Sequence, residues 1–447
     1  MSAGPPRAPL LGSANVESAH ELGPPGRALW RAAWSLLRRN RDFRLFFLGQ
    51  LISFAGDWFL IVAISGLILS LTHSAALVAA IFVAYNLPYG IVSFVGGPLA
   101  DRLDRRRLMI LTNLVMGVLA LGFFMVRGRG DLWLAYVLAA GISAVSALFE
   151  PAASAAVPNL VDAEDLAAAN VLTGSAWGTM LAVGAGIGGL VVAAFGNDVG
   201  YLVDALSFFV AGVLLVWVRR PTAEAREPHE EHPGMIRATR EAVSYSRRDH
   251  RLLALFSVRL GVGVALGVVA LLPVLAINVF HAGARGTGWL FAFRGIGSLV
   301  GPFLIRPIVR RGGLRRMFAA IVLSPAVFAV LYAVVPWMPG VYVAGAAAMA
   351  AHFAGSAQWT LVTYTYQSIV PDRIRGRVFG FDGALITFTL SGSNALCGWL
   401  AGGFSVRTVM TGVGAAVVAY SVLVWFATRK MRLSLAPPLV TTRLAGA

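Results

Sequence analysis

Twelve long apolar runs alternate with short polar or charged gaps along the chain. They cover approximately residues 45–71, 75–99, 107–126, 132–157, 166–195, 199–218, 253–280, 287–309, 316–337, 340–369, 379–403 and 407–427, with ends defined to about four residues. A helix needs roughly 20 apolar residues to cross a bilayer, and each run is about that long or longer. The pattern predicts an all-α membrane protein with twelve transmembrane helices, because transmembrane β-barrels instead have short alternating segments.

The composition supports a membrane protein and removes several other classes. Of 447 residues, 57% are hydrophobic and 13% are charged, whereas soluble domains are about 45–50% apolar and about 25% charged. The single cysteine, Cys397, allows no intrachain disulfide and no cysteine-rich metal site. The single lysine, Lys430, follows the last run, which excludes a P-loop ATPase in this chain and disfavours a retinal protein.

The net charge of +16 follows the topology of the predicted helices. Most basic residues lie in the even-numbered gaps and the two tails. The odd-numbered gaps hold only Arg127, Arg129, Arg285 and Arg407. By the positive-inside rule, both termini are expected in the cytoplasm. The charge therefore gives no support to nucleic-acid binding.

Three short sequence matches indicate an internal repeat. Arg41–Leu45 and Arg248–Leu252 lead into runs 1 and 7, at an offset of 207 residues. A Gly-Pro pair closes run 2 and recurs in run 8, and a Val-Pro pair recurs near the ends of runs 4 and 10. Two six-helix halves that enter the membrane from the same side form a parallel repeat, which places a substrate path between them.

These patterns divide the chain into five parts. They are a cytoplasmic tail at 1–40, a six-helix half at 41–218, a cytoplasmic connector at 219–251, a second six-helix half at 252–429 and a cytoplasmic tail at 430–447. Trp30, Ala33, Trp34 and Leu37 share a helical spacing and predict an interfacial helix within the disordered first tail, although a charged linker is the alternative. A second amphipathic helix is expected at 235–245. The pair His229 and His232 has the wrong spacing for zinc, so no metal site is expected.

The gap between runs 2 and 3 resembles the loop signature of the major facilitator superfamily. Gly97, Asp101, Arg102, Arg105 and Arg106 match that signature, and Asp104 replaces its usual glycine. Together with the twelve-span duplicated layout, the resemblance covers about residues 41–430 and implies the fold of that superfamily. It also implies that this loop latches the two halves in the outward-facing state. Ordinary positive-inside charge is the alternative for the arginines.

A narrower resemblance is to exporters such as the enterobactin exporter and the macrolide efflux proteins. The matching segments are 48–53, 56–58, 149–152, 166–170 and 371–378, in both halves. This resemblance implies efflux. However, run 4 lacks the arginine of many drug/proton antiporters, and Ala185 replaces the proline of a glycine-rich antiporter motif in run 5. That motif is equally explained by close helix packing, so the case for antiport is weaker.

Four carboxylates within the runs are functional candidates, because a charge inside a bilayer is costly. Asp57, near the middle of run 1, is the first choice for proton coupling; the alternative is a structural role, either a permanent ion pair with Arg259 or Arg294 or the cap of a broken helix. Asp204 begins run 6 on the outer side, where water could reach it, and is also a proton-coupling candidate.

The other two carboxylates lie near the cytoplasmic ends of their runs. For Glu150 and Asp382 we expect gating pairs with the arginines of the 2–3 loop or with Arg375 and Arg377, and proton transport is the alternative. An ion pair of this kind would hold the helix ends together in one conformational state.

Two interior arginines and one histidine complete the charged candidates. Arg259 and Arg294 either bind an anionic substrate or neutralise Asp57 or Asp204. His352 in run 10 is a third proton-coupling candidate, since histidine titrates near neutral pH, but a simple hydrogen bond to a neighbour is the alternative.

Aromatic and hydrogen-bonding side chains at mid-depth are candidates for lining a substrate cavity. With the two interior arginines, the set comprises Trp58, Tyr85, Asn86, Arg259, Arg294, Gln358, Trp359 and Tyr364. An amphipathic ligand of moderate size would need such groups. Aromatic packing between helices is the competing explanation.

The sequence thus predicts a secondary active transporter, and proton-coupled efflux of a hydrophobic or amphipathic small molecule is the leading hypothesis. An importer or uniporter on the same fold is the alternative. No enzyme is expected, because no catalytic constellation or substantial soluble domain is evident. The expected partners are a small-molecule substrate, protons and membrane lipids, without a cofactor or nucleic acid, for a monomer in the cell membrane.

Overall fold

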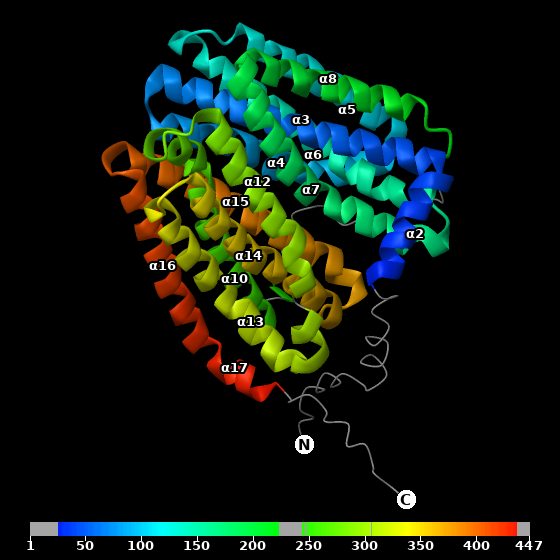
Figure 1. Ribbon diagram of the computed structural model, residues 1–447. Coiled ribbons are helices and arrows are strands. Elements are labelled where there is room, and N and C mark those ends of the chain that lie inside the picture. Colours follow the sequence, from blue (N-terminus) through cyan, green and yellow to red (C-terminus); the bar gives the residue numbers. More distant parts are fainter. Residues whose placement is uncertain (1–25, 223–243, 246, 248, 305, 436–447) are drawn as a thin grey trace, which may run out of the picture.

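A computed structural model describes residues 26–222, 244, 245, 247, 249–304 and 306–435 (Figure 1). Within these ranges, the side chains of 26–29, 94–102, 304–314 and 372–373 are not described. Residues 1–25 of the predicted tail at 1–40, the His229–His232 pair and nearly all of the predicted helix at 235–245 therefore lie outside the described residues.

The first half of the chain forms six long helices. They are α3 (Arg41–Thr72), α4 (Ala75–Arg102), α5 (Arg105–Gly122), α6 (Leu132–Leu160), α7 (Leu166–Phe195) and α8 (Asn197–Val216). Short polar residues start two of them: the Asn40 side chain accepts a hydrogen bond from Phe43 N at 2.9 Å, and Asp104 accepts one from Arg107 N at 2.8 Å. The aspartate that replaces the glycine of the loop signature thus caps α5.

The second half has six matching helical segments. The first is composite and comprises α10 (His250–Leu266), η5 (Gly267–Leu271), α11 (Leu272–Val274) and η6 (Leu275–Val279). The others are α12 (Gly283–Leu304), α13 (Arg306–Val334), α14 (Val341–Ile369), α15 (Asp372–Gly403) and α16 (Val406–Ala427), followed by α17 (Arg429–Ser434). The remaining short elements are η2 (Phe123–Met125), η3 (Arg129–Asp131), η4 (Ala163–Asp165) and η7 (Val335–Trp337).

Ten of these helical segments are long and apolar enough to cross a membrane by length and composition, among the described residues. The other two long helices, α12 and α14, complete a set of twelve. The order and approximate bounds match the predicted runs, which confirms the all-α membrane architecture. The composite first segment of the second half was predicted as one uninterrupted run, since apolar periodicity does not distinguish α, 3₁₀ and π turns.

The two halves meet mainly through two helix pairs, α4 with α15 and α7 with α12, and α3 and α4 also contact the composite first segment or α12 of the second half. In Figure 1 these four helices lie in the middle of the view, where the blue-to-green first half borders the second half, whose colours run from green to red. Small residues let the backbones touch: a Cβ atom on Gly189 would lie 2.7 Å from Gly288 Cα, and one on Gly398 would lie 2.6 Å from Ala79 Cβ. By helix direction, both contacts lie at the end of the molecule away from α2, which we call the far end.

Helix α2 (Gly26–Arg39) precedes the first half and packs on α3 and α7. Ala33 and Leu36 are fully buried, whereas Trp30 and Trp34 are exposed. The sequence pattern predicted that both tryptophans share one helix face with Ala33. In the structure, Ala33 packs against the protein, whereas Trp30 and Trp34 are exposed. The helix is observed, and its place at a membrane surface stays a prediction.

Candidate functional site

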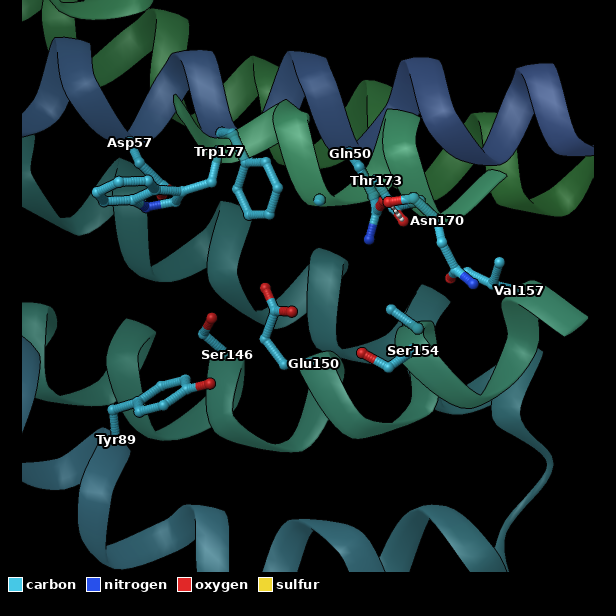
Figure 2. A pocket seen from close by; sticks show the side chains of 13 residues that line it. Gln50, Asp57, Tyr89, Ser146, Glu150, Ser154, Val157, Asn170, Thr173 and Trp177 are labelled. Atoms are coloured by element: carbon cyan, nitrogen blue, oxygen red, sulfur yellow. Dashed lines mark hydrogen bonds between the residues drawn. The ribbon is translucent and has the colours of Figure 1, made fainter. Parts of the chain in front are cut away.

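A cavity of about 570 Å³ lies within the first half, between α3, α4, α6 and α7 (Figure 2). Its lining residues are Gln50, Phe54, Asp57, Tyr89, Ser146, Glu150, Ala153, Ser154, Val157, Asn170, Thr173, Gly174 and Trp177. It extends from Asp57, in the middle of α3, to Val157 and Asn170 beside the α6–α7 connection. That connection is at the end of the molecule where α2 packs, opposite the far end.

Helical spacing brings the lining residues to one side of each helix. Gln50, Phe54 and Asp57 are four and three residues apart on α3, and Asn170, Thr173, Gly174 and Trp177 follow the same rule on α7. Close packing behind α3 holds this face in place, because a Cβ atom on Gly56 would lie 2.7 Å from Ser207 Cβ of α8.

Three carboxyl groups from three helices lie in or beside the cavity. Asp57 and Glu150 line it and interact electrostatically with each other. Asp204 of α8 lies behind Asp57, interacts electrostatically with it, and is fully buried. Neither side-chain oxygen of Asp204 has a hydrogen-bond partner among the described residues. The expectation that water reaches Asp204 is wrong, because α8 packs this face against α3 instead of exposing it at the helix end.

Glu150 was expected to pair with arginines of the 2–3 loop, and for the described side chains of that loop its position in the cavity corrects the prediction. Figure 2 shows its carboxylate pointing from α6 into the space that Asp57 and Trp177 also face. Among the described side chains of the loop, Arg105 donates to Ala155 O at 3.0 Å and Arg106 to Leu215 O at 3.0 Å. These arginines contact backbone carbonyls near the ends of α6 and α8. The side chains of Asp101 and Arg102, and the surroundings of Gly97, are not described.

Asp382 also has a partner other than the expected one. Its Oδ1 and Oδ2 each lie 3.0 Å from Arg259 Nε, and Tyr366 donates its hydroxyl to Oδ1 at 2.8 Å. Arg375 instead donates from Nε to the backbone carbonyl oxygen of Val370 at 3.2 Å. Asp382 is thus a buried counter-charge within the second half and not part of a gating pair with Arg375 or Arg377.

The same ion pair corrects the prediction that Arg259 neutralises Asp57 or Asp204. Arg259 is 1% exposed, and its guanidinium carbon lies 4.1 Å from the centroid of the Trp359 ring. Its partner comes from α15, which is more than 120 residues away along the chain, so no local pattern could have identified the pair.

We expect Asp382→Asn to lower the free energy of unfolding by about 3–5 kcal/mol, because it leaves the buried guanidinium of Arg259 without a counter-charge. The melting temperature of the purified protein in detergent measures the change. Asp198→Asn is the matched control: Asp198 pairs with Arg127 at 2.8 Å, both side chains are at least half exposed, and a loss below about 1 kcal/mol is expected. Equal melting temperatures for the two variants would contradict the prediction.

Arg294 and His352 form a second buried network. Arg294 donates from Nε to His352 Nε2 at 3.0 Å, and the Tyr332 hydroxyl lies 2.9 Å from the same ring nitrogen. The Arg294 guanidinium carbon lies 5.7 Å from the Trp177 ring centroid. Arg294 therefore contacts a histidine and an aromatic ring and neutralises neither Asp57 nor Asp204, which corrects that expectation. His352 matches the alternative of a hydrogen bond to a neighbour and does not line the cavity.

None of the eight predicted cavity residues lines this cavity. Trp58 contacts the wall from outside, since its ring centroid lies 6.3 Å from that of the lining residue Trp177. Tyr85 and Gln358 have buried polar atoms without partners, and Asn86 donates to Phe82 O at 2.7 Å. The Trp359 ring packs over the Arg259 guanidinium. Tyr364 packs against a buried hydrophobic cluster of the second half that includes Leu252 and Phe318.

Sequence reasoning missed most of the cavity lining. Tyr89, Ser146, Thr173 and Trp177 were not selected, although Gln50 and Asn170 occurred in the exporter-like segments. A usable signal existed, because polar residues recur at helical spacing within otherwise apolar runs 1, 4 and 5.

The model of the Major Facilitator Superfamily matches residues 46–392. The chain belongs to the Major Facilitator Superfamily. It is therefore a multi-pass membrane transporter and not an enzyme, which confirms the expected family and fold.

Two relatives and one solved structure illustrate the similarity. The chain is 25% identical to the uncharacterized MFS-type transporter YfiS of Bacillus subtilis (strain 168), over 82% of this chain and 89% of YfiS. It is 27% identical to the enterobactin exporter EntS of Citrobacter koseri, over 79% of this chain and 84% of EntS. A bacterial homolog of the human lysosomal transporter Spinster, in an inward-facing and unoccupied conformation, superimposes with a TM-score of 0.65 at 14% identity, covering 88% and 97% of the two chains. The last shows the fold alone.

Proposed function

We propose that this transporter exports a hydrophobic or amphipathic small molecule and is driven by the proton gradient across the cell membrane. The observation that carries the proposal is the cavity in which Asp57 and Glu150 face each other, with Asp204 buried behind them. Among the side chains that the structure describes, no arginine, lysine or histidine lines this cavity. A carboxyl group without a fixed cationic partner can bind and release a proton as access alternates.

The direction of transport rests on similarity. EntS is an exporter and covers most of this chain. The distribution of arginines supports a cytoplasmic location for both termini, and hence for the cavity end of the molecule. In this arrangement the substrate enters from the cytoplasm, and protonation of Asp57 from outside resets the transporter. We propose that the monomer performs this cycle.

Inside-out membrane vesicles with an acidified lumen test the proposal. A pH-sensitive dye reports proton release from the lumen as macrolides, tetracyclines, catecholate siderophores and lipophilic cations are added one at a time. Proton release that depends on both the transporter and a compound supports proton-coupled export. Compound accumulation without proton movement would exclude proton coupling.

The second candidate function is an importer or uniporter, because the fold allows either direction. Whole cells distinguish it from export. If expression of the transporter raises the cellular content of the compound, transport is inward and the export proposal fails.

A further inference from the structure

The charge of the cavity wall limits what can bind there. Two of the thirteen lining residues are carboxylates, Asp57 and Glu150, and none carries a positive charge. Asp204 adds a third carboxyl group directly behind Asp57. A ligand in this cavity therefore meets an electrostatic environment that favours positive charge and opposes negative charge.

A hydrogen-bond acceptor in the cavity wall points to the same ligand chemistry. Gln50 lines the cavity, is only 9% exposed, and its Oε1 atom has no hydrogen-bond partner. A buried amide oxygen without a donor is costly, so its position favours a ligand that brings a donor. An ammonium group supplies both the donor and the charge.

Aromatic and apolar surface occupies much of the remaining wall. Phe54, Tyr89 and Trp177 line the cavity, and 44% of the Trp177 surface is exposed. Aromatic faces, tryptophan above all, attract organic cations. A volume of about 570 Å³ suits a drug-sized ligand, whereas a bare metal ion would leave the aromatic surface without a partner.

We propose that the cavity binds an organic cation, a protonated amine or quaternary ammonium group on an apolar or aromatic body, with Glu150 and Asp57 as its counter-charges. This inference rests on the proposed function, since it identifies the charge class of the exported molecule. Arg294 of the second half lies beside Trp177 without lining the cavity. Both charged residues of the first half in the described lining, Asp57 and Glu150, are acidic.

Two probes of the same size and shape but opposite charge test the inference. Tetraphenylphosphonium is a cation and tetraphenylborate is its anionic counterpart. Displaceable equilibrium binding of each probe is measured on purified, bead-immobilised full-length protein, at one pH and without a gradient. We expect the phosphonium ion to bind at least tenfold more tightly than the borate.

Matched variants locate the bound charge. Glu150→Gln keeps the shape of the side chain and is expected to weaken phosphonium binding about 10- to 100-fold, as for a lost contact to a charged group. Glu164→Gln makes the same change at an exposed glutamate of η4 and is expected to leave binding unchanged. Trp177→Leu tests the aromatic wall if the first variant does not fold, with a weaker but measurable loss expected.

The outcomes separate this inference from proton coupling. Equal or tighter binding of the borate, no displaceable phosphonium binding, or displacement by millimolar sodium would overturn the inference. Charge-selective binding that depends on Glu150, together with vesicles that release no protons, would retain it and exclude proton coupling. Proton release driven only by anionic or neutral compounds would support proton coupling and overturn the inference of a cationic ligand.

Discussion

Vesicles that contain the Asp57→Asn transporter are expected to show no compound-dependent proton release, while the purified variant stays folded. Asparagine keeps the size and hydrogen-bonding shape of the side chain but cannot exchange a proton. Asp57 lies between the cavity and Asp204 and interacts electrostatically with both Glu150 and Asp204. Without a titratable group at this position, the ligand site no longer has an electrostatic link to the buried carboxyl group of α8.

The expected defect is mainly in coupling. Glu150 and Gln50 remain in the cavity of the variant, so a substrate still binds, although more weakly because one of its two counter-charges is lost, and it can exchange down its own gradient. We expect counterflow in proteoliposomes to continue while uphill transport falls to the level of protein-free vesicles. Undiminished uphill transport by Asp57→Asn would refute the role assigned to Asp57.

Asp198→Asn is the control for this experiment. It removes a carboxylate from the same half, but Asp198 is exposed and pairs with Arg127 away from the cavity. Proton-coupled transport by this variant should equal that of the wild type. A similar defect in both variants would indicate a general effect of removing negative charge from the first half.

Gly189→Leu is expected to reduce transport about 10- to 100-fold by preventing closure at the far end. The first added atom would lie 2.7 Å from Gly288 Cα and 2.8 Å from Ala284 O, both of which are backbone atoms of α12. Because backbone atoms cannot move aside as a side chain can, removing this steric clash requires α7 and α12 to separate. Overpacking of this kind costs about 1–3 kcal/mol, and each 1.4 kcal/mol changes the population of the closed state tenfold.

Spin labels measure the separation directly. His73→Cys and Phe404→Cys place labels in the α3–α4 and α15–α16 turns at the far end, in a Cys397→Ser background that removes the single native thiol. We expect a longer distance between the labels in Gly189→Leu. Gly412→Leu is the control, because a Cβ atom there meets no neighbour within 4 Å. An unchanged distance together with normal transport in Gly189→Leu would show that this contact does not control closure.

The sequence by itself determined the membrane architecture of this transporter. The twelve apolar runs were sufficient, because span length and burial in lipid leave few alternatives for a helical chain. The sequence also identified Asp57 and Glu150 as candidates, since the cost of burying a charge applies wherever the neighbouring helices lie.

Tertiary structure alone decided which of these groups face each other. The partner of Arg259 is Asp382 and not Asp57, and Arg294 contacts His352, because helices far apart in the chain determine these distances. The composite first segment of the second half and the burial of Asp204 likewise depend on neighbouring helices. Hydropathy depends on the residues of one segment, whereas a cavity and an ion pair depend on the relative rotation of several segments. For that reason the fold could be predicted from the sequence, and the lining of the cavity could not.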